Sequence, residues 1–149
     1  MGNWEGIVVH HTASPTGVWQ GGRWRKIGVE DVRRWHLGQG YKEVGYHYLI
    51  DGDGEVWPGR SLEEVGAHCR ASRRNHTHLG VAVIGNMEYQ APSPAQMESL
   101  IKLCRALMER YGIPAGKVEL HKQVPGAATL CPGHYFPVTY FYGQIKEKG

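Results

Sequence analysis

Apolar residues along this chain fall either into short unbroken runs or into stripes with helical spacing. Short runs rich in β-branched residues are typical of buried strands. On this basis the sequence predicts strands at residues 6–11, 45–50, 55–57, 79–84 and 117–120. The four residues 51–54, Asp-Gly-Asp-Gly, are predicted to form a hairpin turn. Residues 12–26, which are rich in glycine and tryptophan, are predicted to be a long loop.

Two segments outside these runs are predicted to be helices. Val29, Val32 and Trp35 recur at the spacing of one helix face, which predicts a helix over residues 29–38. The segment at residues 138–146, near the end of the chain, is predicted to be a terminal helix.

The clearest helix begins after Ser93. Pro94 takes its first position, Gln96 is placed to complete a capping box, and Gly112 ends it. Its buried stripe consists of Met97, Leu100, Ile101, Cys104, Leu107, Met108 and Tyr111. Helices interleaved with strands indicate an α/β fold, and we expect a single domain with a central mixed β-sheet flanked by helices.

Composition and charge narrow the possible partners. The chain has 149 residues, of which 41% are hydrophobic and 21% charged, as in an ordinary globular domain. The formal net charge is +3, and the lysines and arginines are scattered. Proteins that bind nucleic acid usually carry a stronger and more clustered positive charge, so we expect no nucleic-acid partner. The three cysteines form no Cys-x-x-Cys pair, and a disulfide framework is not expected.

Neither a signal peptide nor a membrane span is predicted. The first residues lack a long apolar segment, and no run of 18 apolar residues occurs. We therefore expect synthesis in the cytoplasm without a signal peptide, and no insertion into a membrane.

Two histidines and one cysteine are the strongest candidates for metal ligands. His10 lies in the first apolar run, His121 follows the strand predicted at 117–120, and Cys131 lies in a loop of small residues. Two imidazoles and one thiolate suit zinc, and catalytic zinc sites typically have three protein ligands and one open position. His11 is next to His10 in a predicted strand, so the two side chains should point to opposite faces. The residue pattern leaves open which of them faces the site.

Five segments of the chain resemble, in the same order, the signatures of one family. They are VVHHTA at 8–13, VGYHYLI with DGDG at 44–54, VGAH at 65–68, LGVAVIGN at 79–86, and His121 with TLCPG at 129–133. The chain is similar here to the zinc-dependent N-acetylmuramoyl-L-alanine amidases, the type-2 amidase and peptidoglycan-recognition-protein group, which includes phage endolysins. The resemblance covers about residues 4–136.

The resemblance implies one zinc ion in a cleft on one face of the sheet, bound by His10, His121 and Cys131. It selects His10 over His11 because the family's ligand is the histidine directly after the apolar strand. The other histidines and cysteines show no common zinc spacing, so a second metal site is not expected.

The resemblance also assigns catalytic residues, and among the candidates for substrate binding it supports His68 and Asn75 most. It implies that Tyr46 is catalytic, and it matches Thr129 to a position where members have lysine or threonine. A groove for a sugar-peptide needs aromatic platforms and polar side chains. The candidates for this groove are His68, Asn75, Trp35, His36 and Arg60.

The implied activity is hydrolysis of the amide bond between N-acetylmuramic acid and L-alanine in bacterial peptidoglycan, as in a phage or prophage endolysin. On this reading residues 1–149 are a catalytic domain without a separate wall-binding domain. We expect a monomer whose partner is peptidoglycan and which reaches the wall through a separate pore-forming protein. The sequence has no His-Glu-x-x-His motif, which argues against a zinc peptidase of that type.

Two other functions remain open at this point. One is a recognition protein that binds muropeptides without cleaving them; Cys131 counts against it, because non-catalytic relatives typically lack this ligand. The other is a regulatory protein with a purely structural zinc ion, which no residue specifically supports.

Overall fold

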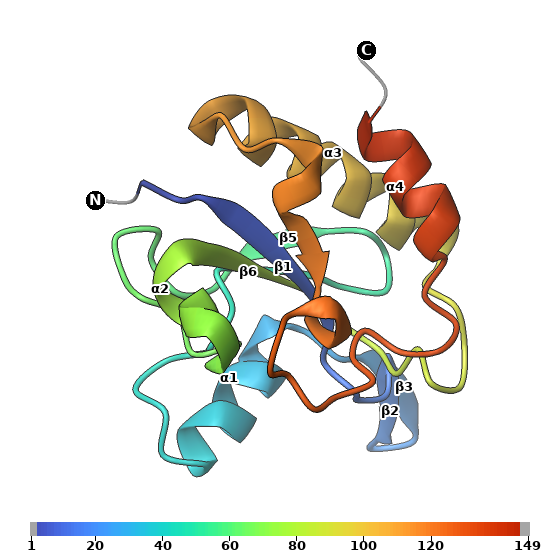
Figure 1. The fold of residues 1–149 in the computed structure, drawn as a ribbon. Coiled ribbons are helices and arrows are strands. Elements are labelled where there is room, and N and C mark those ends of the chain that lie inside the picture. The colour runs from blue at the N-terminus through green and yellow to red at the C-terminus, as the bar shows by residue number, and fades with distance from the viewer. Residues whose placement is uncertain (1–2, 147–149) are drawn as a thin grey trace.

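The computed structural model describes residues 3–146; Met1 and Gly2, which belong to the segment where no signal peptide is expected, lie outside this range. Five strands form one sheet in the order β5-β4-β6-β1-β7, and β2 and β3 form a small separate sheet (Figure 1). The strands are β1 (Gly6–His11), β2 (Gly17–Gln20), β3 (Arg23–Lys26), β4 (Tyr48–Ile50), β5 (Val56–Pro58), β6 (His78–Val83) and β7 (Val118–Leu120). The helices are α1 (Val29–Gly38), α2 (Arg74–Thr77), α3 (Pro94–Tyr111) and α4 (Val138–Lys146), with short 3₁₀ helices η1 (Ala71–Arg73), η2 (Ala115–Lys117) and η3 (His121–Gln123).

The large sheet is mixed, with its parallel part at the centre. β1 pairs in parallel with both β6 and β7, β4 pairs in parallel with β6, and β5 runs antiparallel at one edge. β1 and β6 are buried along their whole length, as expected for strands covered on both faces. The predicted α/β fold with a central mixed sheet is confirmed.

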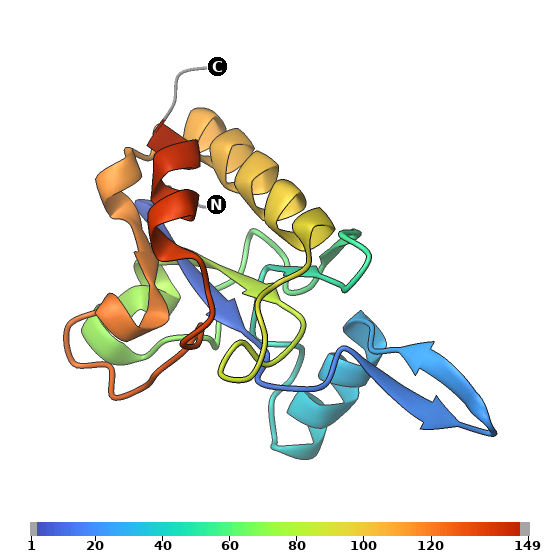
Figure 2. The ribbon, with the colours of Figure 1, turned by 90° about the vertical axis from the view of Figure 1, so that its right-hand side faces the viewer.

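Helices cover both faces of this sheet. α3 and α4 lie together on one side, while α1 and α2 lie on the other (Figures 1 and 2). Along β1, Ile7 and Val9 belong to the main core, which includes Leu100 of α3 and Phe141 of α4. Val8 belongs to a different cluster on the opposite face. Because side chains alternate along a strand, His10 shares the face of Val8.

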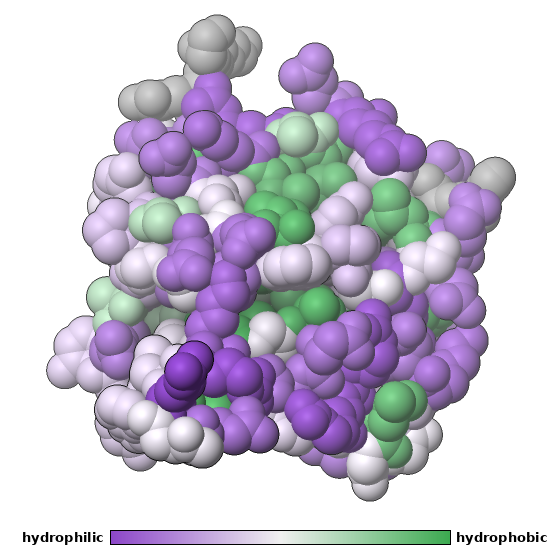
Figure 3. Space-filling model, turned by 180° about the vertical axis from the view of Figure 1, so that it is seen from behind, coloured by the Kyte–Doolittle hydropathy of each residue, from purple (hydrophilic) through white to green (hydrophobic). Residues whose placement is uncertain are grey.

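One face of the molecule is mostly polar. The side of the molecule in Figure 3 shows predominantly hydrophilic residues with separate apolar areas between them, which is ordinary for a globular protein. Among the described residues, no helix combines the length and hydropathy needed to cross a bilayer.

The prediction of a long loop at residues 12–26 is wrong for residues 17–26, which form the projecting β2–β3 hairpin (Figure 2). Gly21 and Gly22 have φ angles of 60° and 77°, values that a two-residue hairpin turn needs and that glycine adopts readily. Trp19 and Trp24 lie opposite each other on the two strands and are 69% and 58% exposed. The strands were missed because they bury almost nothing, so no apolar run marks them.

Ion pairs fix the base of this hairpin to the β4–β5 turn. The Nζ atom of Lys26 lies 2.7–3.1 Å from carboxylate oxygens of Asp51, Asp53 and Glu55. The hairpin turn predicted between the two strands is confirmed, since β4 and β5 pair in antiparallel fashion.

β4 is shorter than the strand predicted at 45–50. Gly45 bonds to a helix and a loop instead of to a strand: its N–H donates to Nδ1 of His36 on α1, and its carbonyl accepts from the N–H of Ala67. The chain therefore enters the sheet only at Tyr48.

The start of α3 is tied to the sheet by one buried amide. Ser93 caps the helix by accepting from the backbone N–H of Gln96, and Gln96 Oε1 accepts from the N–H of Ser93 in return. The amide nitrogen of Gln96 donates to the carbonyl of Ile84 at 2.8 Å, just beyond β6. Gln96 is 1% exposed, so these bonds have no competition from water.

We predict that Gln96→Ala lowers the free energy of unfolding by about 2–4 kcal/mol, because it removes the partners of the half-buried N–H of Ser93 and of the buried carbonyl of Ile84. Equilibrium urea unfolding measures this. Glu98→Ala is the matched control on the same helix; Glu98 is exposed, and we expect a change within about 0.5 kcal/mol. Equal losses in the two variants would contradict the role of Gln96.

Candidate metal centre and active site

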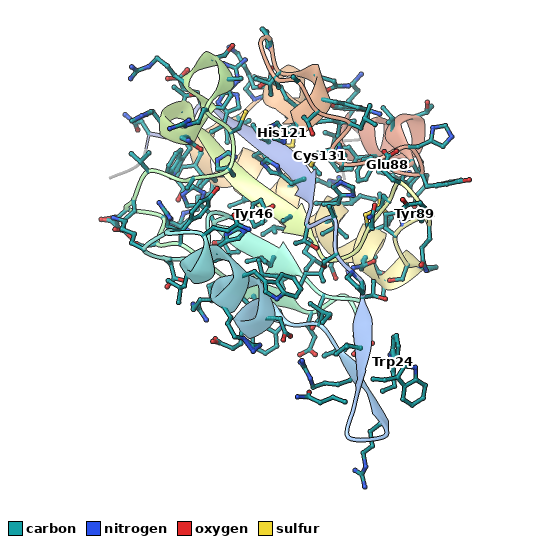
Figure 4. All side chains as sticks on the ribbon, turned by 90° about the horizontal axis from the view of Figure 1, so that it is seen from below. Trp24, Tyr46, Glu88, Tyr89, His121 and Cys131 are labelled. Atoms are coloured by element: carbon teal, nitrogen blue, oxygen red, sulfur yellow. The ribbon has the colours of Figure 1, made fainter. Side chains whose placement is uncertain are left out.

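Three candidate metal ligands meet at one edge of the sheet. His10 lies near the end of β1, and His121 follows directly after β7, which is parallel to β1. Because neighbouring parallel strands end at the same edge, these two side chains are brought together. One donor atom from each of His10, His121 and Cys131 lies within 4.8 Å of the others. Figure 4 shows His121 and Cys131 next to each other, with Tyr46 on the same side of the sheet.

Side chains alternate between the two faces of β1, and His10, not His11, points to the face where the candidate ligands meet. The His10 ring lies 4.5 Å from the His121 ring, centroid to centroid, and its Nδ1 is 3.7 Å from Cys131 Sγ. The His11 ring lies on the opposite face, where its Nδ1 accepts a hydrogen bond from the N–H of Met87. His11 nevertheless contributes through its backbone N–H, which donates to Cys131 Sγ at 3.3 Å.

Local hydrogen bonds hold Cys131 in position. Its carbonyl accepts from the N–H of Lys122, which joins the loop to η3. Its own N–H donates to Thr129 Oγ1 at 3.1 Å. Thr129 thus orients the loop that presents the half-buried thiol.

Burial favours the neutral forms of these groups. It lowers the pKa of His10 well below the usual value, and the neighbouring His68 and His121 lower it further. Burial also lowers the pKa of His121, and it raises the pKa of the Cys131 thiol to about 12. Neutral imidazoles are the form that binds metals, and a coordinated cation deprotonates a thiol.

An unpartnered atom shows that these residues fit a metal ion. His121 Nδ1 is buried and has no hydrogen-bond partner among the described residues. A buried polar atom without a partner is unfavourable, and a bound ion would supply one. Two ring nitrogens and one sulfur are ligands that zinc prefers, and three ligands leave the fourth position open.

Tyr46 lies beside the candidate ligands, just before β4. Its ring is 5.1 Å from the His10 ring and 5.5 Å from the His36 ring, centroid to centroid. Burial, with the nearby Cys131, raises the pKa of the Tyr46 hydroxyl well above its usual value. The phenol therefore stays protonated at neutral pH and can donate a hydrogen bond.

A cavity of about 570 Å³ opens next to the candidate ligands. It is lined by Tyr41, Ala67, His68, Cys69, Arg70, Asn75 and His121. Of the predicted groove residues, His68 and Asn75 lie here. Tyr41 and Arg70 were missed by the sequence analysis, because polar residues in loops are common and neither belongs to a recognisable motif.

Arg60 does not line this cavity. It is only 7% exposed, and its guanidinium donates to the carbonyls of Glu43, Val44 and Val65 at 3.0–3.1 Å. A buried guanidinium bonded to three backbone carbonyls holds two loops together. We therefore assign Arg60 to the structure of these loops and not to the groove.

Trp35 and His36 lie on α1 and are not among the residues that line the cavity. His36 accepts from the N–H of Gly45 at 2.9 Å, and its ring packs against that of Tyr46. It thus supports Tyr46 from α1. Trp35 is 39% exposed, and its contact with substrate stays a prediction.

The fold and the site together define an α/β domain with two imidazoles, a thiol and a tyrosine gathered at the edge of parallel strands, a set suited to metal-assisted hydrolysis. The chain belongs to the N-acetylmuramoyl-L-alanine amidase family Amidase_2, whose model matches residues 1–134. Members of this family are typically zinc-dependent, and the group of His10, His121 and Cys131 could bind a metal.

Known proteins and solved structures agree with this membership. The endolysin of Escherichia phage T7 is 34% identical over 113 residues, which are 72% of this chain and 71% of that protein. The solved N-acetylmuramoyl-L-alanine amidase LysC from Clostridium intestinale matches with a TM-score of 0.80 and 32% identity, over 98% of this chain and 89% of that one. A Drosophila PGRP-LB mutant in complex with tracheal cytotoxin matches with a TM-score of 0.75 and 25% identity, over 93% and 80%. The predicted family, fold and enzyme class are confirmed.

We predict that acid destabilises the metal-free protein from about pH 6.5 downward. Burial lowers the folded-state pKa of His10, His47 and His68, for His68 to about 3. Unfolded histidines titrate near 6.5, so the unfolded state takes up protons first as the pH falls. The stability is therefore present above pH 6.5 and is lost below it, by up to about 1.4 kcal/mol per pH unit for each histidine.

Urea unfolding of the metal-free protein between pH 7.5 and about 5 measures this loss; most carboxylates stay ionised in that window. A His47→Gln variant should show a shallower decline, because one titrating group is removed. A free energy of unfolding that stays constant between pH 6.5 and 5 would contradict the prediction.

Proposed function

We propose that this chain is an endolysin-type amidase that cleaves the bond between N-acetylmuramic acid and L-alanine in bacterial peptidoglycan, with one zinc ion bound by His10, His121 and Cys131. The observation that carries the proposal is the convergence of these three donors within 4.8 Å in a chain of the amidase family. The similarity to a phage endolysin supports a role in lysis of the cell wall.

The chemistry is divided between the ion and the side chains around it. Zinc in this site would supply Lewis acidity toward the scissile carbonyl and make water nucleophilic near neutral pH. His10 and His121 offer lone pairs because burial favours their neutral forms. The N–H of His11, which donates to Cys131 Sγ, favours the thiolate over the thiol.

Tyr46 has the geometry and protonation state of an oxyanion donor. It lies next to His10, and its hydroxyl keeps its proton because burial raises its pKa. As the carbonyl is attacked, negative charge develops on its oxygen, and a donor held in place beforehand stabilises that charge. We give Thr129 a positioning role instead, because its hydroxyl oxygen accepts from the N–H of Cys131.

The cavity beside these residues is the proposed site for the stem peptide. The oxygen of the Asn75 side chain accepts from the N–H groups of His68 and Cys69, so its amide N–H groups are left for substrate. Arg70 adds a positive charge to the same cavity. Binding of peptidoglycan is supported by the family and by the related PGRP-LB complex with tracheal cytotoxin.

A recognition protein that binds without cleaving is the second candidate, because peptidoglycan-recognition proteins are among the relatives. The position of Cys131 among the metal donors counts against it. Four expectations from the sequence stay predictions. They are a monomeric state, the absence of a nucleic-acid partner, the assignment of the chain as a catalytic domain, and release through a separate pore-forming protein.

We predict that removal of the metal abolishes lysis. The protein is treated with a chelator, zinc loss is verified by elemental analysis, and clearing of a turbid cell-wall suspension is followed. Adding back one equivalent of zinc should restore clearing, and mass spectrometry should then find peptides with a free N-terminal L-alanine. Unchanged lysis after verified zinc removal would reject the proposal, and binding of walls without released peptide would favour the recognition protein.

We predict that Tyr46→Phe lowers kcat by roughly 10²–10³-fold, the usual effect of removing one oxyanion donor. Zinc content and melting temperature should stay as in the wild type, since only a hydroxyl is lost. Tyr48→Phe is the matched control, because Tyr48 packs against the core on the other face of the sheet. A Tyr46→Phe enzyme with wild-type kcat would show that this hydroxyl takes no part in the reaction.

A further inference from the structure

His68 lies directly behind the candidate ligand His10. It is 8% exposed, and both of its ring nitrogens have partners within the protein. Its Nδ1 is 3.0 Å from His10 Nε2, and its Nε2 is 2.9 Å from the backbone carbonyl of His78. The ring therefore lines the cavity without offering a free nitrogen to substrate, unlike the substrate-binding role that the sequence predicts.

The carbonyl of His78 determines which ring nitrogens of His68 and His10 carry a hydrogen. A carbonyl oxygen can only accept, so His68 Nε2 carries a hydrogen and donates it to His78. A neutral imidazole has only one N–H, so His68 Nδ1 must be an acceptor. The hydrogen between the two rings then belongs to His10 Nε2, and His10 Nδ1 is left with a free lone pair. That Nδ1 is the atom 3.7 Å from Cys131 Sγ.

The ring of His68 is held in a slot made by two glycines. A Cβ atom on Gly80 of β6 would lie 2.5 Å from Cγ and Cδ2 of this ring, and one on Gly66 would lie 2.5 Å from its Cδ2. Both distances are too short for any real side chain, so each glycine makes room for the imidazole. The backbone at His68 is fixed as well, because its N–H donates to Asn75 Oδ1 at 2.7 Å.

We infer that His68 is a positioning residue that fixes the orientation and tautomer of His10, so that His10 Nδ1 presents its lone pair to the metal. The inference rests on the proposed metal site. A histidine ligand in the wrong tautomer would point an N–H at the ion, and it would have to exchange its proton before it could bind. Loss of such a supporting contact typically weakens metal binding by roughly 10–100-fold.

Two variants separate positioning from simple packing. His68→Leu fills most of the space but cannot accept from His10, and we expect the zinc Kd, measured by competition with a chromogenic chelator, to rise roughly 10–100-fold. His68→Gln carries both an acceptor and a donor, and it should recover part of this loss.

His47→Leu is the matched control. His47 is also a buried histidine, with its Nδ1 accepting from Gly80 N–H and its Nε2 2.9 Å from the carbonyl of Glu64. Its ring packs edge-on against His68, with the centroids 5.9 Å apart, but it supplies neither hydrogen-bond partner of His68. His47→Leu keeps this packing and the His68–His10 hydrogen bond, so it should lower the melting temperature but leave the zinc Kd unchanged.

The tautomer itself can be read in the metal-free protein. Long-range ¹H–¹⁵N NMR at neutral pH should show His10 of the wild type protonated at Nε2 only, and a mixture of tautomers in His68→Leu. A wild-type His10 protonated at Nδ1 would overturn the inference even if no variant folded. A zinc Kd that is unchanged in His68→Leu, or raised equally in His47→Leu, would overturn it as well.

Failure of this inference is distinguishable from failure of the proposed function. A wild-type protein that does not bind zinc refutes the proposed metal site, while the tautomer of His10 still reports on His68. A different outcome is a wild-type protein that binds zinc and lyses walls while the His10 tautomer and the zinc Kd do not depend on His68. That outcome leaves the proposed function standing and removes only the role of His68.

Discussion

The site depends on a histidine that the fold keeps out of water at the end of its central strand. His10 is 2% exposed, and β1 lies between β6 and β7. A charged imidazole in this place would be packed against the rings of His68, His121 and Tyr46 without water to solvate it, so the folded state favours the neutral form. A neutral ring has one donor and one acceptor. His68 accepts the hydrogen bond from His10 Nε2, and His10 Nδ1 is left as the nitrogen that can bind a metal ion.

The fold gives up local stability to build this arrangement. Gly80 interrupts the apolar run of β6 at its centre, although a glycine inside a strand lacks a side chain to pack. The space it leaves is filled by the ring of His68, so the core stays dense. His121 Nδ1 has no hydrogen-bond partner within residues 3–146, a further unfavourable term that a bound ion would remove. The metal-free protein is therefore expected to be less stable than the loaded one.

The sequence predicted those features that are encoded locally. β1, β6 and α3 were found because an apolar run or a capping box marks each of them. The three candidate ligands were identified from their residue types and from the family resemblance, which alone selected His10 over His11. The β2–β3 hairpin was missed because its strands are exposed. The surroundings of Arg60 and His68 depend on contacts between residues far apart in the chain, such as the pair of His10 and His68, which no local pattern records.

The adjacent histidines His10 and His11 lie at the end of β1, where their rings point to opposite faces of the sheet and have different roles. The ring of His10 turns toward Cys131, while the ring of His11 turns away and accepts from Met87 N–H on the side of the main core. That anchor fixes the peptide unit between the two histidines, and the N–H of this unit donates to Cys131 Sγ. A hydrogen bond to the charged form favours ionisation of the thiol. The second histidine thus acts through its backbone, and its ring serves to hold that backbone in place.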